Sequence, residues 1–189
     1  MTARRYDAAI LSLSRAVERF PDQPAVYAVL GRVWLDLSEA RGDRVALNKA
    51  IEALTIAATD AAATSETLSM LARARTLAGD HAGAERAYRL ATARLPVHPP
   101  AYRQLATLAA QANRLMEARD ALIRYVTLIG AEEPIAGAAT EIAAYSLRLG
   151  DSATALRWID RAIDEGGETP ALSAMRRRVA ADTEKLGAR

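Results

Sequence analysis

The sequence predicts an all-α protein built from stacked antiparallel helix pairs, with about ten helices in all. Alanine and leucine dominate its apolar residues while only 5% of the chain is aromatic, a balance that favours close helix packing over β-sheets. At 189 residues and 51% hydrophobic content, the chain is long enough to bury a continuous core. Its apolar markers also recur at a fixed spacing, which is typical of repeat proteins.

The repeat period is 34 residues. Leu71 and Leu105 are 34 residues apart, and so are Ala84 and Ala118. The next copy is offset by 37 residues, because about three residues are added around 132–135, where we expect a loop. These markers divide a single repeat domain (1–189) into a half-repeat (1–23), a long repeat (24–64), three further repeats (65–98, 99–135 and 136–168) and a C-terminal capping helix (169–189).

The first segment matches only the second half of a repeat, through the markers Tyr6, Asp7, Ala9, Leu13, Ala16 and Pro21. A half-repeat leaves an apolar face uncovered. Two explanations are open: the chain is a fragment of a longer array, which we favour, or this face packs against another copy in a homodimer.

The long repeat opens with the first-helix markers Tyr27, Leu30, Gly31 and Trp34. Leu30 and Leu71 are 41 residues apart, so this repeat holds seven extra residues, roughly two helical turns. We expect one added turn on each helix and a protruding tip at Arg41–Asp43. Trp34 is expected to be buried between repeats.

The last segment predicts one helix from Thr169 to Leu186, with Thr169 as its cap and Pro170 in its first turn. Gly166 and Gly167 would stop the helix before it. The run Arg176–Arg178 is interpreted as the solvated face of a capping helix in preference to an anion-binding patch.

The recurring markers resemble those of the tetratricopeptide repeat (TPR) family, whose period is 34 residues and whose signature is an aromatic, a Leu-Gly pair, then Ala, an aromatic and Pro. The resemblance covers nearly the whole chain and implies a right-handed superhelical solenoid of antiparallel helix pairs. It is incomplete, because an aromatic opens only the repeats at Tyr27 and Tyr102, and the closing proline is clear only at Pro21 and Pro96. Small residues at matching positions would let paired helices approach closely; they are Gly31, Ala72, Ala106 and Ala143 on first helices and Ala50, Ala84, Ala118 and Ala155 on second helices.

Composition and motifs argue against several function classes. A net charge of +2, with acids and bases interspersed, gives little support for nucleic-acid binding, and without cysteine there are no disulfides or thiolate zinc sites. No apolar run is long enough to span a bilayer, and either a cytoplasmic or a periplasmic location fits. His81 and His98 lack the spaced partners of a zinc site, and no phosphate-binding loop or nucleophile motif occurs. We therefore expect no enzyme activity, metal or cofactor.

Resemblance to TPR proteins implies that the first helices line a concave groove in which partners bind. Counting from the core positions predicts these groove residues: Arg32, Arg73, Arg103, Thr107, Gln111 and Arg148, with Ala28, Leu35, Ser69, Thr76, Thr140 and Ala144 beside them. Arg32, Arg73 and Arg103 would form a basic rung suited to an acidic or C-terminal peptide, since arginine can hold a carboxylate at two points. The alternative is a surface pair of Arg32 with Asp36, four residues on. The Lys and Asn clamp of chaperone-binding TPR proteins is not supported, because Ala28 and Met70 stand at corresponding positions.

The predicted function is a protein–protein interaction scaffold, in a chain whose Ala- and Arg-rich composition is typical of bacteria. One alternative is an assembly module that joins copies through the terminal helices. Another is an accessory domain of a larger enzyme. Trp158, beside the core position Ile159 on a second helix, is expected at an outer edge, facing solvent or a partner.

Overall fold

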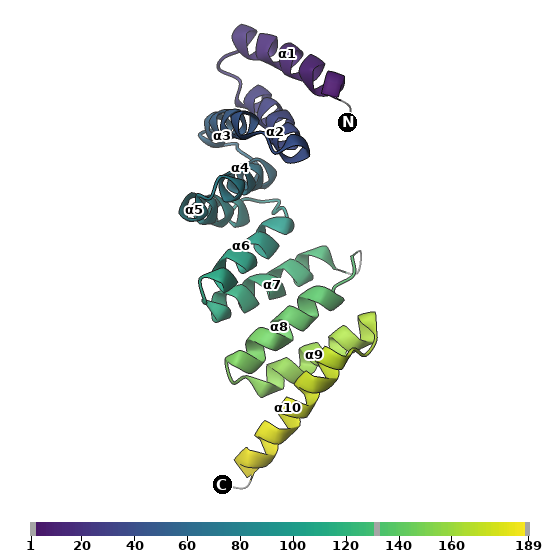
Figure 1. Ribbon diagram of the computed structural model, residues 1–189. Helices are drawn as coiled ribbons and strands as arrows, with labels where there is room; N and C mark the ends of the chain where they lie inside the picture. Colours follow the sequence, from purple (N-terminus) through teal and green to yellow (C-terminus); the bar gives the residue numbers. More distant parts are fainter. Residues whose placement is uncertain (1–2, 131–132, 188–189) are drawn as a thin grey trace. The chain divides into compact units, whose positions relative to one another are not determined.

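The computed structural model describes the backbone of residues 3–130 and 133–187 and the side chains of residues 5–130 and 133–181. In that part of the chain it contains ten α-helices and no strand, which confirms the predicted all-α class (Figure 1). The helices are α1 (Ala3–Arg19), α2 (Pro24–Arg41), α3 (Arg44–Ala58), α4 (Ser65–Leu77), α5 (His81–Thr92), α6 (Pro100–Gln111), α7 (Leu115–Ile129), α8 (Ala136–Arg148), α9 (Ser152–Gly166) and α10 (Pro170–Gly187). Glu132, in the expected loop, lies outside the described residues, while residues 133–135 precede α8 without helical structure.

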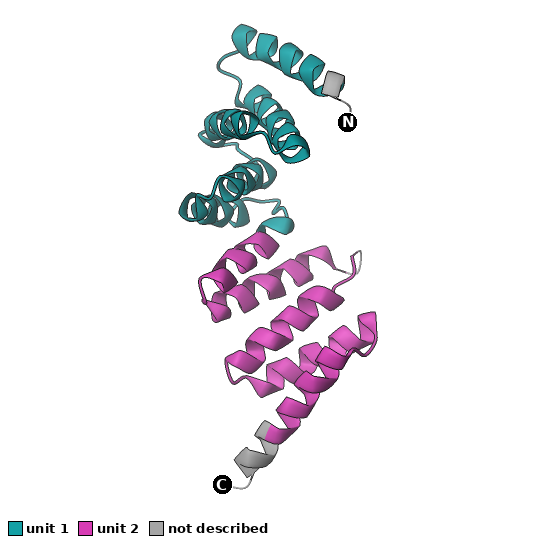
Figure 2. Ribbon diagram, in the orientation of Figure 1, with its two compact units in different colours: residues 1–101 teal, residues 102–189 magenta. Residues whose placement is uncertain are grey.

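The helices group into two compact units, residues 1–101 and residues 102–189 (Figure 2). In unit 1, α2 pairs with α3 and α4 pairs with α5, and α1 packs on α2. In unit 2, α8 pairs with α9, α7 packs on α8, and α10 packs on both α8 and α9. Below, α2, α4, α6 and α8 are the first helices of their repeats, and α3, α5, α7 and α9 are the second helices.

The turns inside the helix pairs share one chemistry. In three of them a glycine with positive φ is followed by an aspartate that caps the second helix; the pairs are Gly42-Asp43, Gly79-Asp80 and Gly150-Asp151. Asp43, for example, accepts hydrogen bonds from the backbone N–H groups of Val45 and Ala46 at 2.8 and 3.2 Å. The α6–α7 turn has Asn113 at positive φ instead, and Arg114 provides no side-chain cap.

Small residues allow the paired helices to approach closely, as expected from the repeat pattern. A Cβ atom added to Gly31 of α2 would lie only 2.6 Å from Cγ of Leu54 on α3, so no larger residue fits without a shift. The alanines that mark the repeats are also fully or nearly fully buried: Ala50, Ala72, Ala84, Ala106, Ala118, Ala143 and Ala155. In unit 2, Ala106 lies in an apolar cluster around Leu122 and Ile142, and Ala143 and Ala155 lie in a second one around Ile159 and Leu172.

The long repeat gains its extra length in both helices. α2 and α3 have 18 and 15 residues, compared with 13 and 12 in α4 and α5. Arg41, Gly42 and Arg44 at the tip are exposed. The added turns are not fully exposed to solvent, however, because Leu37 and Ala46 are buried in a cluster with Tyr6 of α1. α1 therefore covers one side of the extended hairpin.

The same cluster also includes Trp34, which packs partly buried against it, with the Lys49 ammonium 4.6 Å from its ring. This agrees with the expected burial of Trp34. On α1 itself, Leu11 and the following Phe20 are 54% and 44% exposed. Helix α1 thus uses only part of its apolar surface in this chain.

The C-terminal helix begins at Pro170, and the hydroxyl of Thr169 accepts a hydrogen bond from the N–H of Leu172 at 3.3 Å. Gly167, with a φ of 81°, follows the last residue of α9. Leu172 and Val179 are buried against α8 and α9, and Arg176 pairs with Asp160 of α9. Among the described residues, no helix combines the length and the apolar character that crossing a bilayer requires.

Candidate partner-binding surfaces

Arg32 and Arg73, predicted for the groove of unit 1, are exposed and paired with glutamates on the neighbouring first helix. Arg32 Nη1 lies 3.3 Å from Glu66 Oε1, which joins α2 to α4. Arg73 lies 2.6 Å from Glu39 through Nε and donates a second hydrogen bond through Nη2 at 2.8 Å, which joins α4 back to α2. Both partners are 34 residues away in the sequence. The ion pair of Arg32 is thus with Glu66, not with Asp36.

Unit 2 repeats this arrangement with one pair. Arg103 of α6 donates to Glu141 of α8 at 2.9 Å and lies over the ring of Tyr125, 5.6 Å from its centre. Arg148, at the end of α8, donates to the side-chain oxygen of Asn113 at 3.0 Å. Burial, followed by the charge of Glu141, raises the pKa of Tyr145, whose phenol is near the pair of Arg103 and Glu141.

The remaining predicted groove residues lie on α6. Thr107 and Gln111 are exposed, and the Thr107 hydroxyl donates to the carbonyl of Arg103 at 3.1 Å. Two residues expected beside the groove, Leu35 and Ser69, are instead buried, with 3% and 7% exposure. Helix α2 packs on α1, α3 and α4. The exposed face of a first helix is therefore narrower than the prediction assumed, because that prediction considered the helical positions of each first helix alone.

These pairs define in each unit what we call the first-helix surface, which comprises Arg32, Glu39, Glu66 and Arg73 in unit 1 and Arg103, Glu141 and Arg148 in unit 2. It carries both signs of charge and not only the expected arginines. The members of the ion pairs are mostly half exposed, and such pairs contribute at most about 1 kcal/mol each. A carboxylate on a ligand can therefore replace a glutamate at little cost. A continuous rung that also includes Arg103 stays a prediction.

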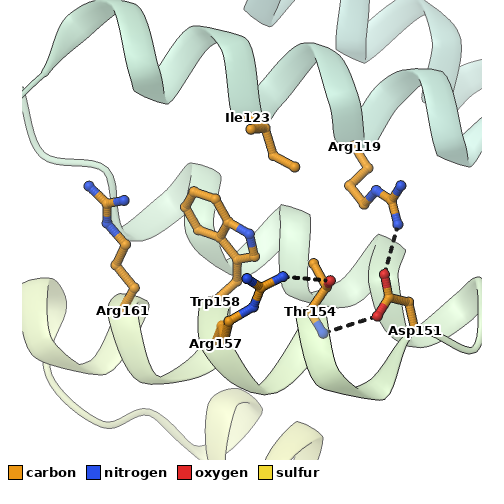
Figure 3. Close-up of a pocket in the computed structure, with 7 residues that line it drawn as sticks. All are labelled: Arg119, Ile123, Asp151, Thr154, Arg157, Trp158 and Arg161. Atoms are coloured by element: carbon orange, nitrogen blue, oxygen red, sulfur yellow. Dashed lines mark hydrogen bonds and ion pairs between the residues drawn. The ribbon is translucent and has the colours of Figure 1, made fainter.

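Sequence reasoning missed a groove of about 410 Å³ in unit 2, between α7 and α9 (Figure 3). Its lining residues are Arg119, Ile123, Asp151, Thr154, Arg157, Trp158 and Arg161. Only Trp158 had been singled out. The signal was present, because residues 154, 157, 158 and 161 share one helix face. It was overlooked because the search for binding residues was confined to first helices.

Both histidines belong to unit 1 and neither lines this groove. His81 is exposed at the start of α5. His98 follows α5 in a connecting loop, where its backbone N–H donates to the Ser65 hydroxyl at 2.9 Å and its buried Nδ1 has no partner among the described residues. No cluster of His, Asp and Glu able to hold a metal ion occurs in the part of the chain that the structure describes.

No family model matches the sequence, and no curated protein is significantly similar to it. Solved structures do resemble it. The structure of MamA protein is 19% identical, with a TM-score of 0.69 over 85% of this chain and 82% of MamA. YrrB, described as a TPR protein with an unusual peptide-binding site, is 15% identical, with a TM-score of 0.68 over 92% of this chain and 84% of YrrB. A thermophilic TPR protein from Thermus thermophilus is 20% identical, with a TM-score of 0.54 over 95% of this chain and 91% of its own. At these identities the likeness concerns the fold.

Proposed function

We propose that this chain, which has the tetratricopeptide repeat fold, is an interaction scaffold that binds a protein or peptide partner on its first-helix surface. The observation that carries the proposal is the polar, accessible character of that surface, where charged side chains from neighbouring first helices meet. The likeness to YrrB, whose description names a peptide-binding site, supports the same function.

The partner we propose is an acidic segment held in the concave groove that the TPR resemblance implies. Arg73 already holds a carboxylate of Glu39 at two points, which is the geometry that an acidic ligand would exploit. Arg148 is bonded to the neutral side chain of Asn113, so it can accept a carboxylate without giving up an ion pair among the described residues. Glu39, Glu66 and Glu141 would compete with an acidic ligand for the arginines with which they pair.

The first test is affinity capture from a host lysate, with retained proteins identified by mass spectrometry. Wild type is compared with the R32E/R73E/R103E variant and with a control that reverses three exposed arginines elsewhere, R15E/R86E/R178E. We expect a partner that wild type and control retain and the first variant loses. If all three chains retain the same proteins, binding on the first-helix surface is refuted.

A second test removes the internal competitors. In the E39Q/E66Q variant, Arg32 and Arg73 lose their carboxylate partners while the arginines themselves remain. A captured acidic partner should bind this variant several-fold more tightly, because no ion pair has to be broken first. Weaker binding would mean that the glutamates themselves contact the partner, and the acidic-ligand proposal would fail.

A second candidate function is assembly through α1, favoured by the exposure of Leu11 and Phe20. Exposed apolar side chains of this size, one on α1 and one directly after it, suit contact with a second copy. The average mass measured by light scattering should then rise with concentration in wild type and not in the L11D/F20D variant. A mass that stays monomeric at all concentrations rules out the homodimer.

A further inference from the structure

The groove between α7 and α9 lies between two second helices of unit 2 and shares no lining residue with the first-helix surface. α7 contributes Arg119 and Ile123, which are one helical turn apart (Figure 3). α9 contributes Thr154, Arg157, Trp158 and Arg161, and Asp151 directly precedes it. Side chains from the two helices therefore face each other across a groove of about 410 Å³, within the range of about 300–1,000 Å³ usual for ligand pockets.

Positive charge in this groove is only partly compensated. Its single carboxylate, Asp151, accepts the backbone N–H of Thr154 at 3.0 Å and lies 3.2 Å from Arg119. Hydrogen bonds from the backbone and the side chain of Thr154, followed by the charges of Arg119 and Arg157, hold the pKa of Asp151 below its ordinary value, so this one carboxylate offsets part of the positive charge of both arginines. Arg119 also pairs with Asp120 at 3.1 Å, so it is engaged as well.

Arg157 and Arg161 differ from the arginines of the first-helix surface. Arg157 donates to the hydroxyl of Thr154 at 3.0 Å, and Arg161 lies over the Trp158 ring, 5.3 Å from its centre. Among the described side chains, neither has a carboxylate at ion-pair distance, whereas Arg32, Arg73 and Arg103 each have one. Two guanidinium groups are thus available for an anion beside an indole.

The apolar side of the groove packs against the core of unit 2. Trp158 is partly buried and packs against both apolar clusters of unit 2. Ile123, opposite, packs against the cluster that contains Leu122 and Ile142. A ligand would therefore meet a packed apolar wall next to two cationic side chains, which favours a ligand of mixed apolar and acidic character.

We propose that this groove is a second binding site, which takes an extended segment of a partner protein with acidic residues at alternate positions and apolar residues between them. Arg157 and Arg161 are four residues apart on a helix, about 6 Å along its axis. Alternate side chains of an extended peptide are spaced by about 6.6 Å, so two carboxylates can each reach one arginine. The intervening apolar side chains project to the opposite side of the extended peptide, toward α7, where they would pack against Ile123.

A single-stranded nucleic acid is the competing ligand class, because arginines around an aromatic ring also suit phosphates and bases. Base stacking needs a free ring face. Here Arg161 covers one face of Trp158, and the clusters below bury part of the ring. The arrangement thus favours a peptide.

The test titrates the chain with a capped synthetic peptide of alternating glutamate and leucine. The chain has two tryptophans, so a W34F background leaves Trp158 as the sole indole reporter, and calorimetry on the wild-type chain provides a second measurement. We expect saturable binding that changes the Trp158 emission. The matched peptide with glutamine in place of glutamate should bind at least about tenfold more weakly, because a neutral amide cannot form the charged hydrogen bonds that a carboxylate accepts from the two arginines.

Two variants with the same change of charge locate the site. R157E/R161E should weaken binding at least about tenfold, while R177E/R178E, which alters exposed arginines of α10 outside the groove, should retain it. Far-UV circular dichroism checks that both remain folded. Equal binding by both variants, equal binding of the glutamine peptide, or binding of oligothymidylate in place of the peptide would each overturn the proposal. R32E/R73E/R103E should leave this binding unchanged, which separates the proposal from that of the first-helix surface.

Discussion

Among single residues, Gly31 gives the sharpest prediction about packing. The Cβ of a G31A variant would lie 2.6 Å from Leu54 Cγ, and overpacking of this kind costs about 1–3 kcal/mol. Alanine is favoured over glycine in a helix by about 1 kcal/mol, which offsets part of that cost. We expect a net loss of about 1 kcal/mol in the free energy of unfolding, measured by urea denaturation.

Gly137 provides the matched control. It lies in α8 with open space around its Cα, so G137A brings the helical gain without a clash. This variant should be as stable as wild type or more stable, by up to about 1 kcal/mol. If G31A were also stabilising, the close approach of α2 to α3 would not be the reason for the glycine.

Tyr88 predicts how stability depends on pH. Burial raises its pKa to about 12, against which a hydrogen bond with Thr76 and the charge of Arg73 act in the opposite direction. An unfolded tyrosine loses its proton near pH 10, so between about pH 10 and about pH 12 only the unfolded state is deprotonated at this residue. The free energy of unfolding should therefore fall across that window and be unaffected by Tyr88 below it.

The Y88F variant isolates this contribution from those of other titrating groups. Its stability should decline less than that of wild type as the pH rises above about 10, measured by urea unfolding at a series of pH values. Parallel curves for the two chains would show that Tyr88 titrates normally.

Predictions for single residues succeeded where the contacts of the residue lie within one helix pair. Gly31 and the repeat-marking alanines were identified from their spacing because the same neighbour recurs in every repeat. The partners of Arg32 and Arg73 were not, because they lie 34 residues away and depend on how two first helices align. The burial of Ser69 was missed for the same reason.

At the scale of helices, the relation between α1 and the long α2–α3 hairpin gives a further prediction. Tyr6 is 8% exposed and packs on Leu37 and Ala46, so Y6A would remove most of this contact. Removing a buried aromatic side chain from a cooperative core lowers the free energy of unfolding by roughly 3–5 kcal/mol. A helix at one end of the described chain can instead detach locally. We expect the amides of α1 to lose hydrogen-exchange protection.

Under the same conditions, protection in α8 and α9 of unit 2 should be unchanged. Y6F keeps the ring and should behave nearly as wild type does. If Y6A lowered protection uniformly along the chain, α1 would be part of one cooperative core instead of a separable element.

Helix boundaries were largely predictable because the turns carry their own signals. The Gly-Asp pairs mark three of the hairpin turns, and Thr169-Pro170 marks the start of α10. Seven extra residues in the long repeat were also visible. The contacts of these extra residues could not be predicted. Tyr6 packs onto Leu37 and Ala46, and no local sequence pattern shows that α1 and the long hairpin lie together.

At the scale of the whole molecule, the two units should respond separately to core damage. Leu54 in unit 1 and Ile142 in unit 2 are both fully buried, and replacing either with alanine should cost about 2–5 kcal/mol locally. In repeat proteins stability is spread over repeats and their neighbours. Hydrogen exchange should therefore show L54A opening α2–α5 while α8 and α9 stay protected, and I142A should give the reverse. Identical profiles for the two variants would contradict this.

The 34-residue period predicted the fold of the whole chain because it describes how each repeat packs on the next. It carries no information about how contacts are distributed over many repeats, so the grouping into residues 1–101 and 102–189 had no counterpart in the sequence pattern. The α9 side of the groove was visible as a helical pattern outside the first helices, but its pairing with α7 was not, because these two helices are not consecutive in the chain.

The crossed pairs between α2 and α4 also bear on whether repeats of this chain are interchangeable. Arg32 of α2 pairs with Glu66 of α4, and Glu39 of α2 pairs with Arg73 of α4. If residues 65–98 were replaced by a second copy of the long repeat, the 41-residue offset would place Arg32 of that copy where Arg73 stands, but Ala25 where Glu66 stands. One bridge would survive and the other would vanish. The surface charges of neighbouring repeats are therefore complementary only in their present order. An array with its repeats in another order would need new oppositely charged residues wherever two first helices meet.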